Sequence, residues 1–313
     1  MSITAMRWNG APIVMPGWYD QVPLSIYHSS KITTEPSASS SHLRTLWYKS
    51  PKHFYAKWPY NPDFDPEVDA EESAAFTMGR AAHHLYLGED DFALQFIERP
   101  EKLNTKDGWV DWQGNRTEAK NFMKQQKAAG RTVLTPNDIK TIRGMAHSVA
   151  DEQLAIDLLQ GAVEQTLIAR DPETGIWLKA RPDVIPTSDG MFADLKTTPS
   201  VLDYDLKMTL RKYGYHMQGA LIWEVCELLG LPFDGFALIF VEKKPPFCTR
   251  IIEMTDDDLG RGRLQNRAMI RRMKKCLDEG RWPGPGNADA EMFSMPKAEQ
   301  EFIDMKLQQL EAA

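Results

Sequence analysis

The stretch Arg181-Pro-Asp-Val-Ile-Pro-Thr-Ser-Asp-Gly-Met-Phe-Ala-Asp-Leu-Lys-Thr-Thr198 (RPDVIPTSDGMFADLKTT) decides how the fold is interpreted. Residues 176–185 and 191–197 have the composition of β-strands, and the Pro-Thr-Ser-Asp-Gly between them is turn chemistry. The stretch therefore predicts a β-hairpin. This hairpin carries two carboxylates and a lysine where a strand usually holds apolar residues.

Side chains along a strand point alternately to opposite faces, so the charges of this hairpin can be assigned to faces. One face is apolar and predicts a core. The other face collects acidic and basic side chains: Trp177, Lys179, Arg181 and Asp183 from the first strand, and Phe192, Asp194 and Lys196 from the second.

Pairing of the two strands brings Asp183 near Asp194 in this interpretation. Two carboxylates so close repel each other, and a divalent cation bound to both removes the repulsion. Oxygen ligands suit Mg²⁺ or Mn²⁺. Lys196, on the same face, can orient a water and stabilise charge on a phosphate. The alternative is an exposed hairpin with a surface ion pair, since Asp-x-Lys alone occurs often by chance.

The composition is that of a soluble globular protein. Of 313 residues, 42% are hydrophobic and 26% are charged. No apolar run approaches the ~18 residues of a membrane span, and the N-terminal sequence lacks the pattern of a secretory signal. Three scattered cysteines argue against disulfides or a four-thiolate iron–sulfur cluster. We therefore expect a cytoplasmic protein without a membrane partner.

The net charge of −7 does not by itself suggest nucleic acid as a partner. Residues 261–275 nevertheless carry seven basic side chains and no acidic one. This segment is either a basic binding face or a solvated helix surface.

The order of predicted elements indicates an α/β fold with a helical N-terminal half. Residues 1–35 have no sustained period and predict an irregular arm. Helices are expected near residues 37–48, 73–87, 118–129, 136–159, 203–229 and 256–279, strands at 163–169, 176–185, 191–197, 235–241 and 249–254, and a polar tail at 283–313.

The long predicted helix 203–229 places a polar stripe beside the hairpin. Lys207, Arg211, Tyr215 and Gln218 follow i, i+4, i+8 and i+11 and share one face. Next to a metal site this stripe can hold a substrate phosphate and a 5′ end, and an amphipathic surface helix is the alternative.

Pro182-Asp183 followed by Asp194-Leu-Lys196 resembles the P-D…(D/E)-x-K signature of restriction-endonuclease-like nucleases. The longer string Asp194-Leu-Lys-Thr-Thr198, with Tyr215-His-Met-Gln218 downstream, is similar to the RecE-type exodeoxyribonuclease VIII family of phage and prophage exonucleases, relatives of RecB-like nuclease domains. The resemblance covers about residues 37–282. It implies a restriction-endonuclease-like core with a central mixed β-sheet flanked by helices. The nuclease domain would span 36–282, with a helical part (36–160) and a catalytic α/β core (161–282).

The resemblance also implies further site residues. A Gly-x-x-x-His element reads Gly79-Arg-Ala-Ala-His83 here and makes His83 a metal ligand, with His84 as its rival; a lone histidine on an apolar helix is otherwise a core residue. Glu164 matches an acidic position that is a metal ligand, a ligand's support or a strand-edge charge. Leu195 would offer its backbone carbonyl to the metal. Gln218 matches the catalytic glutamine, although Ile222 stands where relatives carry tyrosine.

The function implied is a Mg²⁺-dependent DNA exonuclease, with Mn²⁺ as a substitute. Its catalytic residues would be Asp183, Asp194, Lys196 and Gln218, and its DNA contacts would be Lys179, Arg181, Lys207, Arg211 and Tyr215. The resemblance implies 5′→3′ digestion of linear double-stranded DNA in phage-type recombination or repair, a ring-like homo-oligomer, and a single-strand annealing protein as partner. The alternatives are a structure-specific endonuclease on the same fold and a catalytically idle DNA-binding module.

Overall fold

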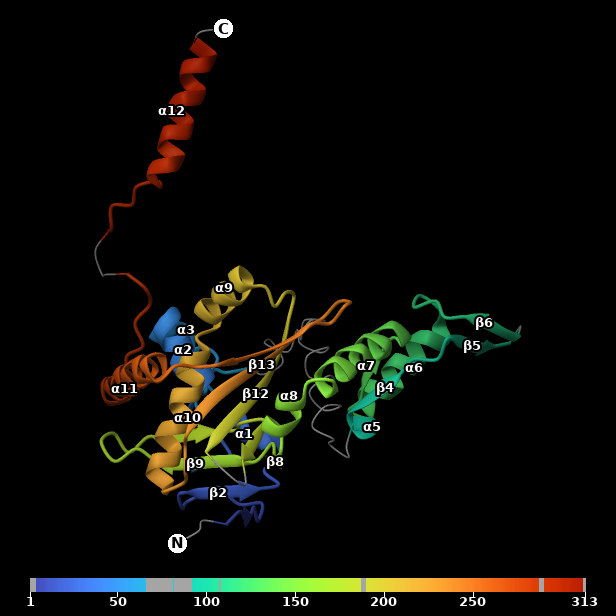
Figure 1. Cartoon of the computed structure of the whole chain (residues 1–313), viewed down its shortest axis with the longest axis horizontal. Helices are drawn as coiled ribbons and strands as arrows, with labels where there is room; N and C mark the ends of the chain where they lie inside the picture. Colours follow the sequence, from blue (N-terminus) through green and yellow to red (C-terminus); the bar gives the residue numbers. More distant parts are fainter. Residues whose placement is uncertain are drawn as a thin grey trace.

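The computed structural model describes residues 4–65, 81, 92–106, 108–186, 190–286 and 290–311. Figure 1 shows the arrangement of the elements. The helices are α1 (Leu24–Tyr27), α2 (Ser40–Tyr48), α3 (Pro51–Tyr55), α5 (Phe92–Gln95), α6 (Thr117–Ala128), α7 (Pro136–Ala150), α8 (Gln153–Leu158), α9 (Asp203–Tyr213), α10 (Tyr215–Leu229), α11 (Asp256–Glu279) and α12 (Lys297–Glu311). The strands are β1 (Met6–Arg7), β2 (Gly17–Asp20), β3 (Ser37–Ser39), β4 (Phe96–Glu98), β5 (Lys102–Thr105), β6 (Gly108–Asp111), β7 (Thr132–Leu134), β8 (Gly161–Val163), β9 (Thr166–Arg170), β10 (Trp177–Ala180), β11 (Val184–Pro186), β12 (Met191–Thr198), β13 (Gly235–Glu242) and β14 (Thr249–Glu253).

Two mixed sheets of five strands each form the centre of the described chain. One has the strand order β14-β13-β12-β11-β8, and the other has the order β1-β2-β9-β10-β3. In the first sheet β12 and β13 run parallel, with Asp194 opposite Leu238. Two small two-stranded sheets, β4-β7 and β5-β6, lie in the part of the chain where we expected helices and a loop but no strands. The strands of this region are short, which is why no alternating pattern marked them.

The predicted hairpin is divided between the two sheets. β10 pairs with β9 in one sheet, whereas β11 pairs with β12 in the other through Val184 and Ala193. The predicted strand 163–169 is divided in the same way into β8 and β9. The chain therefore crosses between the sheets twice, and the crossings lie side by side because the N–H of Glu164 donates to the carbonyl of Asp183 over 3.0 Å. The expected shared face was thus wrong for Asp183, whereas Lys179 and Arg181 both lie over the ring of Tyr27.

The predicted helix 203–229 is also two helices. Gly214 adopts the left-handed conformation with φ of 59° and ends α9 before α10 begins. A Cβ at this position would lie 2.8 Å from the ring of Tyr48, so another residue would have to displace this ring and also adopt the left-handed conformation. The expected common stripe of Lys207, Arg211, Tyr215 and Gln218 is therefore divided between two helices.

The two faces of β12 are covered by different helices. Phe192 packs into a core cluster with Met217 and Leu221 of α10, and Ala193 and Leu195 pack into a second cluster with α7. Because residues alternate along the strand, Asp194 and Lys196 share the face that α10 covers. The sheet order thus places the charged residues of β12 beneath α10.

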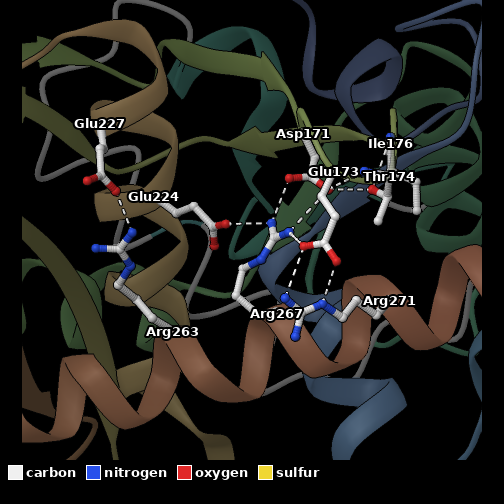
Figure 2. A network of polar contacts seen from close by, with 9 residues as sticks. All are labelled: Asp171, Glu173, Thr174, Ile176, Glu224, Glu227, Arg263, Arg267 and Arg271. Atoms are coloured by element: carbon white, nitrogen blue, oxygen red, sulfur yellow. Dashed lines mark hydrogen bonds and ion pairs between the residues drawn. The ribbon is translucent and has the colours of Figure 1, made fainter.

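A network around Arg267 joins α10, α11 and the β9–β10 turn (Figure 2). Arg267 pairs with Asp171 at 2.6 Å, Glu224 at 2.8 Å and Glu173 at 2.5 Å. Asp171 and Glu224 are buried. At the surface, Glu173 forms a second ion pair with Arg271. Several of the basic residues in segment 261–275 therefore hold the fold together.

Several further expectations differ from the structure at the chain ends and in the helical part. The arm expected to be irregular contains β1 and β2, and β2 pairs with β9. The expected tail contains α12, and the helix expected at 136–159 is α7 followed by α8. The helix predicted at 256–279 is α11 itself, and it starts at a Thr255 side chain that accepts from the N–H of Asp258. In the described part of the chain, no helix has the length and hydropathy to cross a membrane.

Candidate active site

Asp183 lies at the second crossing between the sheets and is buried. The pairing of β11 with β12 stops at Val184 and Ala193. Beyond this bridge the Asp183 carboxylate takes the place of a strand partner, because its Oδ2 accepts a hydrogen bond of 2.5 Å from the backbone N–H of Leu195. The break in the predicted hairpin therefore brings Asp183 to the edge of β12.

Asp194 is 1% exposed and projects from β12 toward α10. Its Oδ1 accepts a hydrogen bond of 2.7 Å from Nε2 of Gln218, and its Oδ2 forms an ion pair with Nζ of Lys196. The next residue along the strand, Leu195, holds Asp183. The structure therefore brings Asp183, Asp194, Lys196 and Gln218 together.

Lys196 is held in its charged form by the two aspartates. Burial alone would lower the pKa of its ammonium group, but the charges of Asp194 and Asp183 outweigh burial and raise the pKa. The Lys196 ammonium lies 5.6 Å from the centre of the Tyr215 ring, and this ring stacks on Tyr213 at 5.7 Å. Tyr215 thus lies beside Lys196, and its expected role as a DNA contact stays a prediction.

The two aspartates supply oxygen ligands of the kind that Mg²⁺ and Mn²⁺ prefer. Among the described residues, no group of three or more His, Cys, Asp or Glu side chains is arranged to hold a metal ion. The expected third ligand, His83, and its rival His84 lie outside the described residues. Ala81, which is described, is buried in the core cluster that contains Ala193 and Leu195.

Glu164 forms an ion pair with Arg181 at 2.6 Å. Arg181 also donates to the carbonyl of Val22 over 2.6 Å. Glu164 therefore places a negative charge beside Arg181, and its expected role as a metal ligand or a ligand's support stays a prediction. The φ of 51° at Glu164 belongs to the turn that ends β8.

A pocket of about 200 Å³ opens beside Gln218 and is lined by cationic and hydroxyl side chains. Arg44 of α2 donates to the carbonyl of Tyr213 over 2.8 Å. Burial lowers the pKa of Arg44, and the charges of Tyr215 and Asp194 act in the opposite direction, which links the pocket to the aspartates. Other lining residues are Tyr27, His28, Ser39, Ser40, Ser41, Lys179 and Arg181.

Lys179 is 1% exposed, and burial lowers its pKa to about 7. Its Nζ donates to the carbonyl of Tyr27 and lies 4.8 Å from the centre of that ring. Burial, followed by the charge of Lys179, lowers the pKa of His28 to about 4 and that of His42 to about 3. The pocket therefore gathers basic groups whose charged forms a bound anion would stabilise.

The structure adds pocket residues that sequence reasoning missed and separates others that it predicted. Arg44 carries no local signal, and the serines of 39–41 were interpreted only as a helix start. Lys207 does not line this pocket, and Arg211 lines a different groove, together with His216. This separation follows from the break at Gly214.

Comparison with known proteins adds the following findings. A family model described as a PDDEXK-like domain of unknown function (DUF3799) matches residues 39–292. No curated protein matches the sequence.

The solved structure of a candidate exonuclease from Eubacterium rectale resembles the chain with a TM-score of 0.57 at 16% identity. The match covers 90% of this chain and 98% of that one. An alkaline exonuclease from Laribacter hongkongensis gives a TM-score of 0.27 at 12% identity, covering 54% and 87%. A phage-related exonuclease from Haemophilus somnus 129PT gives 0.26 at 13%, covering 64% and 95%. The last two superpose too poorly to bear on function. The family match and the first structure confirm the predicted restriction-endonuclease-like fold.

Proposed function

Because this chain belongs to the family of PDDEXK-like domains of unknown function (DUF3799), we propose that it is a metal-dependent nuclease that hydrolyses phosphodiester bonds. The observation that carries the proposal is the cluster of two buried aspartates, Asp183 and Asp194, with the half-buried Lys196. Both aspartates accept hydrogen bonds that orient them, Asp183 from the N–H of Leu195 and Asp194 from Gln218. A surface ion pair, the alternative, would need neither the burial nor these donors.

Asp183 and Asp194 would hold Mg²⁺, with Mn²⁺ as a substitute. Two buried carboxylates side by side repel each other, and the donors around them fit a site built to keep both ionised. When bound, the cation would supply positive charge beside the scissile phosphate. His83 and the backbone carbonyl of Leu195 are proposed as further ligands.

Lys196 and Gln218 have separate roles in the proposed hydrolysis. Lys196 orients the attacking water and stabilises the negative charge that develops on the phosphate. Gln218 fixes the rotamer of Asp194 and acts through it. Tyr215 supports Lys196 through its ring face.

The cationic pocket supports an exonuclease acting on linear DNA. Arg44, Lys179 and the hydroxyls at the start of α2 suit a phosphate next to the scissile bond. Such a small pocket suits a strand end better than a continuous duplex. The resemblance to RecE-type enzymes favours 5′→3′ digestion in phage-type recombination or repair, a ring-like oligomer and an annealing protein as partner.

The proposed function is tested with linear duplex DNA labelled at one end, with and without a 5′ phosphate. Mg²⁺-dependent release of nucleotides from the 5′ end, abolished by EDTA, is the expected result. Covalently closed circular DNA is the matched substrate. If it is cut as fast as linear DNA, the protein is an endonuclease and the exonuclease proposal is wrong. If the wild-type protein releases nothing from either DNA, the nuclease proposal itself is wrong.

A further inference from the structure

A second groove, away from the candidate active site, lies between α7 and the connection of β13 to β14. Figure 1 shows this connection reaching toward α7. The groove has a volume of about 770 Å³. Its lining residues include Asn137, Lys140, Thr141, Arg143, Lys243 and Lys244.

The two walls of the groove are joined at two points. A Cβ at Gly144 would lie 2.3 Å from the ring of Phe247, so a larger residue would displace this ring from α7. Further along the helix, the hydroxyls of Ser148 and Thr249 lie 2.9 Å apart in a hydrogen bond. The groove is therefore a built feature of the fold.

The groove is positively charged in an acidic protein. Lys140, Arg143 and Lys244 are exposed, and within the described residues none of them forms an ion pair. Among the described residues that line the groove, the acidic one is Asp138, whose carboxylate accepts from the N–H of Thr135 over 2.8 Å. An anionic partner could therefore bind these basic side chains with little competition from carboxylates in the groove.

The groove lies at the end of the strand that carries Asp194. The N–H of Lys243 donates to the carbonyl of Thr198 over 3.0 Å. Thr198 follows Asp194 by four residues of β12, which corresponds to roughly 13 Å along a strand. This length equals about four base-pair steps of duplex DNA.

We propose that this groove binds the sugar–phosphate backbone of duplex DNA on the undigested side of the cut, an assignment that rests on the proposed nuclease function. Lysine, arginine, threonine and asparagine are side chains that contact phosphates in protein–DNA complexes. An acidic protein is a poorer fit as the partner that binds this groove, because protein–protein interfaces are depleted in lysine and centred on apolar anchor residues. Phe247, which could serve as an anchor, packs against Gly144 instead.

The test is the binding of a fluorescent duplex of about 20 base pairs in EDTA, so that binding is measured without cleavage. The variant Lys140→Ala/Arg143→Ala/Lys244→Ala is expected to bind the duplex at least about tenfold more weakly than the wild type. The slope of the logarithm of its binding constant against the logarithm of the salt concentration should be smaller in magnitude by about 2 to 3. The control variant is Lys120→Ala/Lys124→Ala/Lys127→Ala on the exposed face of α6. It removes the same charge and is expected to bind like the wild type.

Urea unfolding confirms that each variant is folded. Equal affinity and equal salt slope in the wild type and the groove variant would overturn the proposal, and so would an equal loss in the α6 control. Because no cleavage is needed, the result stands apart from the digestion experiment. A chain that bound through the groove but released no nucleotides would contradict the nuclease function alone.

Discussion

The backbone N–H of Leu195 donates to Oδ2 of Asp183 over 2.5 Å, and Oδ1 of the neighbouring Asp194 accepts a hydrogen bond of 2.7 Å from Nε2 of Gln218. Leu195 of β12 thus orients the carboxylate of Asp183, and the preceding residue of the same strand, Asp194, supplies the second carboxylate. The two aspartates come from strands that separate just beyond their last paired residues, which leaves the edge of β12 open to a side chain.

Asp194→Asn and Lys196→Ala are expected to lower kcat by about 10²- to 10⁴-fold, because each removes a charge from the proposed reaction centre. The measurement is Mg²⁺-dependent release of nucleotides from linear duplex DNA. Circular dichroism of both variants should match that of the wild type. Activity within a factor of two of wild type would rule out the proposed roles.

Gln218→Ala is expected to lower activity by about 10- to 100-fold and to raise the Mg²⁺ concentration needed for half-maximal rate, because Asp194 loses the donor that orients it. The control is Gln265→Ala. Gln265 makes a hydrogen bond of similar length, 2.6 Å, to His216 on the far side of α10. A loss of the same size in both variants would mean that α10 was disturbed as a whole.

Arg267→Met is expected to lower the free energy of unfolding by about 3 kcal/mol, since it leaves the carboxylates of Asp171 and Glu224 buried without their partner. Urea denaturation measures the change. Arg271→Met removes an exposed ion pair with Glu173 and should change stability little. Equal effects of the two substitutions would show that burial of the network (Figure 2) does not determine how much it contributes to the free energy of unfolding.

Lys179 should make the stability of the wild type depend on pH above neutrality. The pKa of Lys179 is about 7 in the folded protein and 10.5 in its ordinary state. Between these values the unfolded chain binds the proton and the folded chain does not, so stability rises as the pH rises. Burial of the Lys179 side chain disfavours its charged form in the folded protein.

The comparison is with Lys179→Met, which lacks the titrating group. From pH 7 to pH 10, the wild type should gain up to about 4 kcal/mol relative to this variant in urea unfolding. A constant difference across this range would contradict a depressed pKa for Lys179. DNA binding by the variant should weaken if Lys179 contacts phosphate.

Local patterns predicted the elements whose ends are set by nearby residues. The helix 256–279 starts at the Thr255 cap and ends before Gly280, and both signals lie in the sequence next to it. Asp194 and Lys196 lie two residues apart on one strand, so alternation alone places them on one face.

The rest depended on partners that are distant in the sequence. The division of 163–169 and 176–185 into strands of different sheets follows from pairing with β2, β3 and β12, which no local period encodes. Arg44 reaches the pocket because α2 packs beside α10, from about 170 residues away. The break at Gly214 was not predicted, because the residues on both sides of it continue one helical pattern.

The Arg267 network also bears on how the chain folds during its synthesis. Asp171 precedes Arg267 by 96 residues and Glu224 precedes it by 43. At roughly 5–20 residues per second, Asp171 leaves the peptidyl-transferase centre about 5–20 seconds before its arginine is added. Until then the turn and α10 hold carboxylates that favour water over the interior. The network can therefore form only after α11 has been synthesised, and α11 supplies the positive charge that these carboxylates bind in the folded chain.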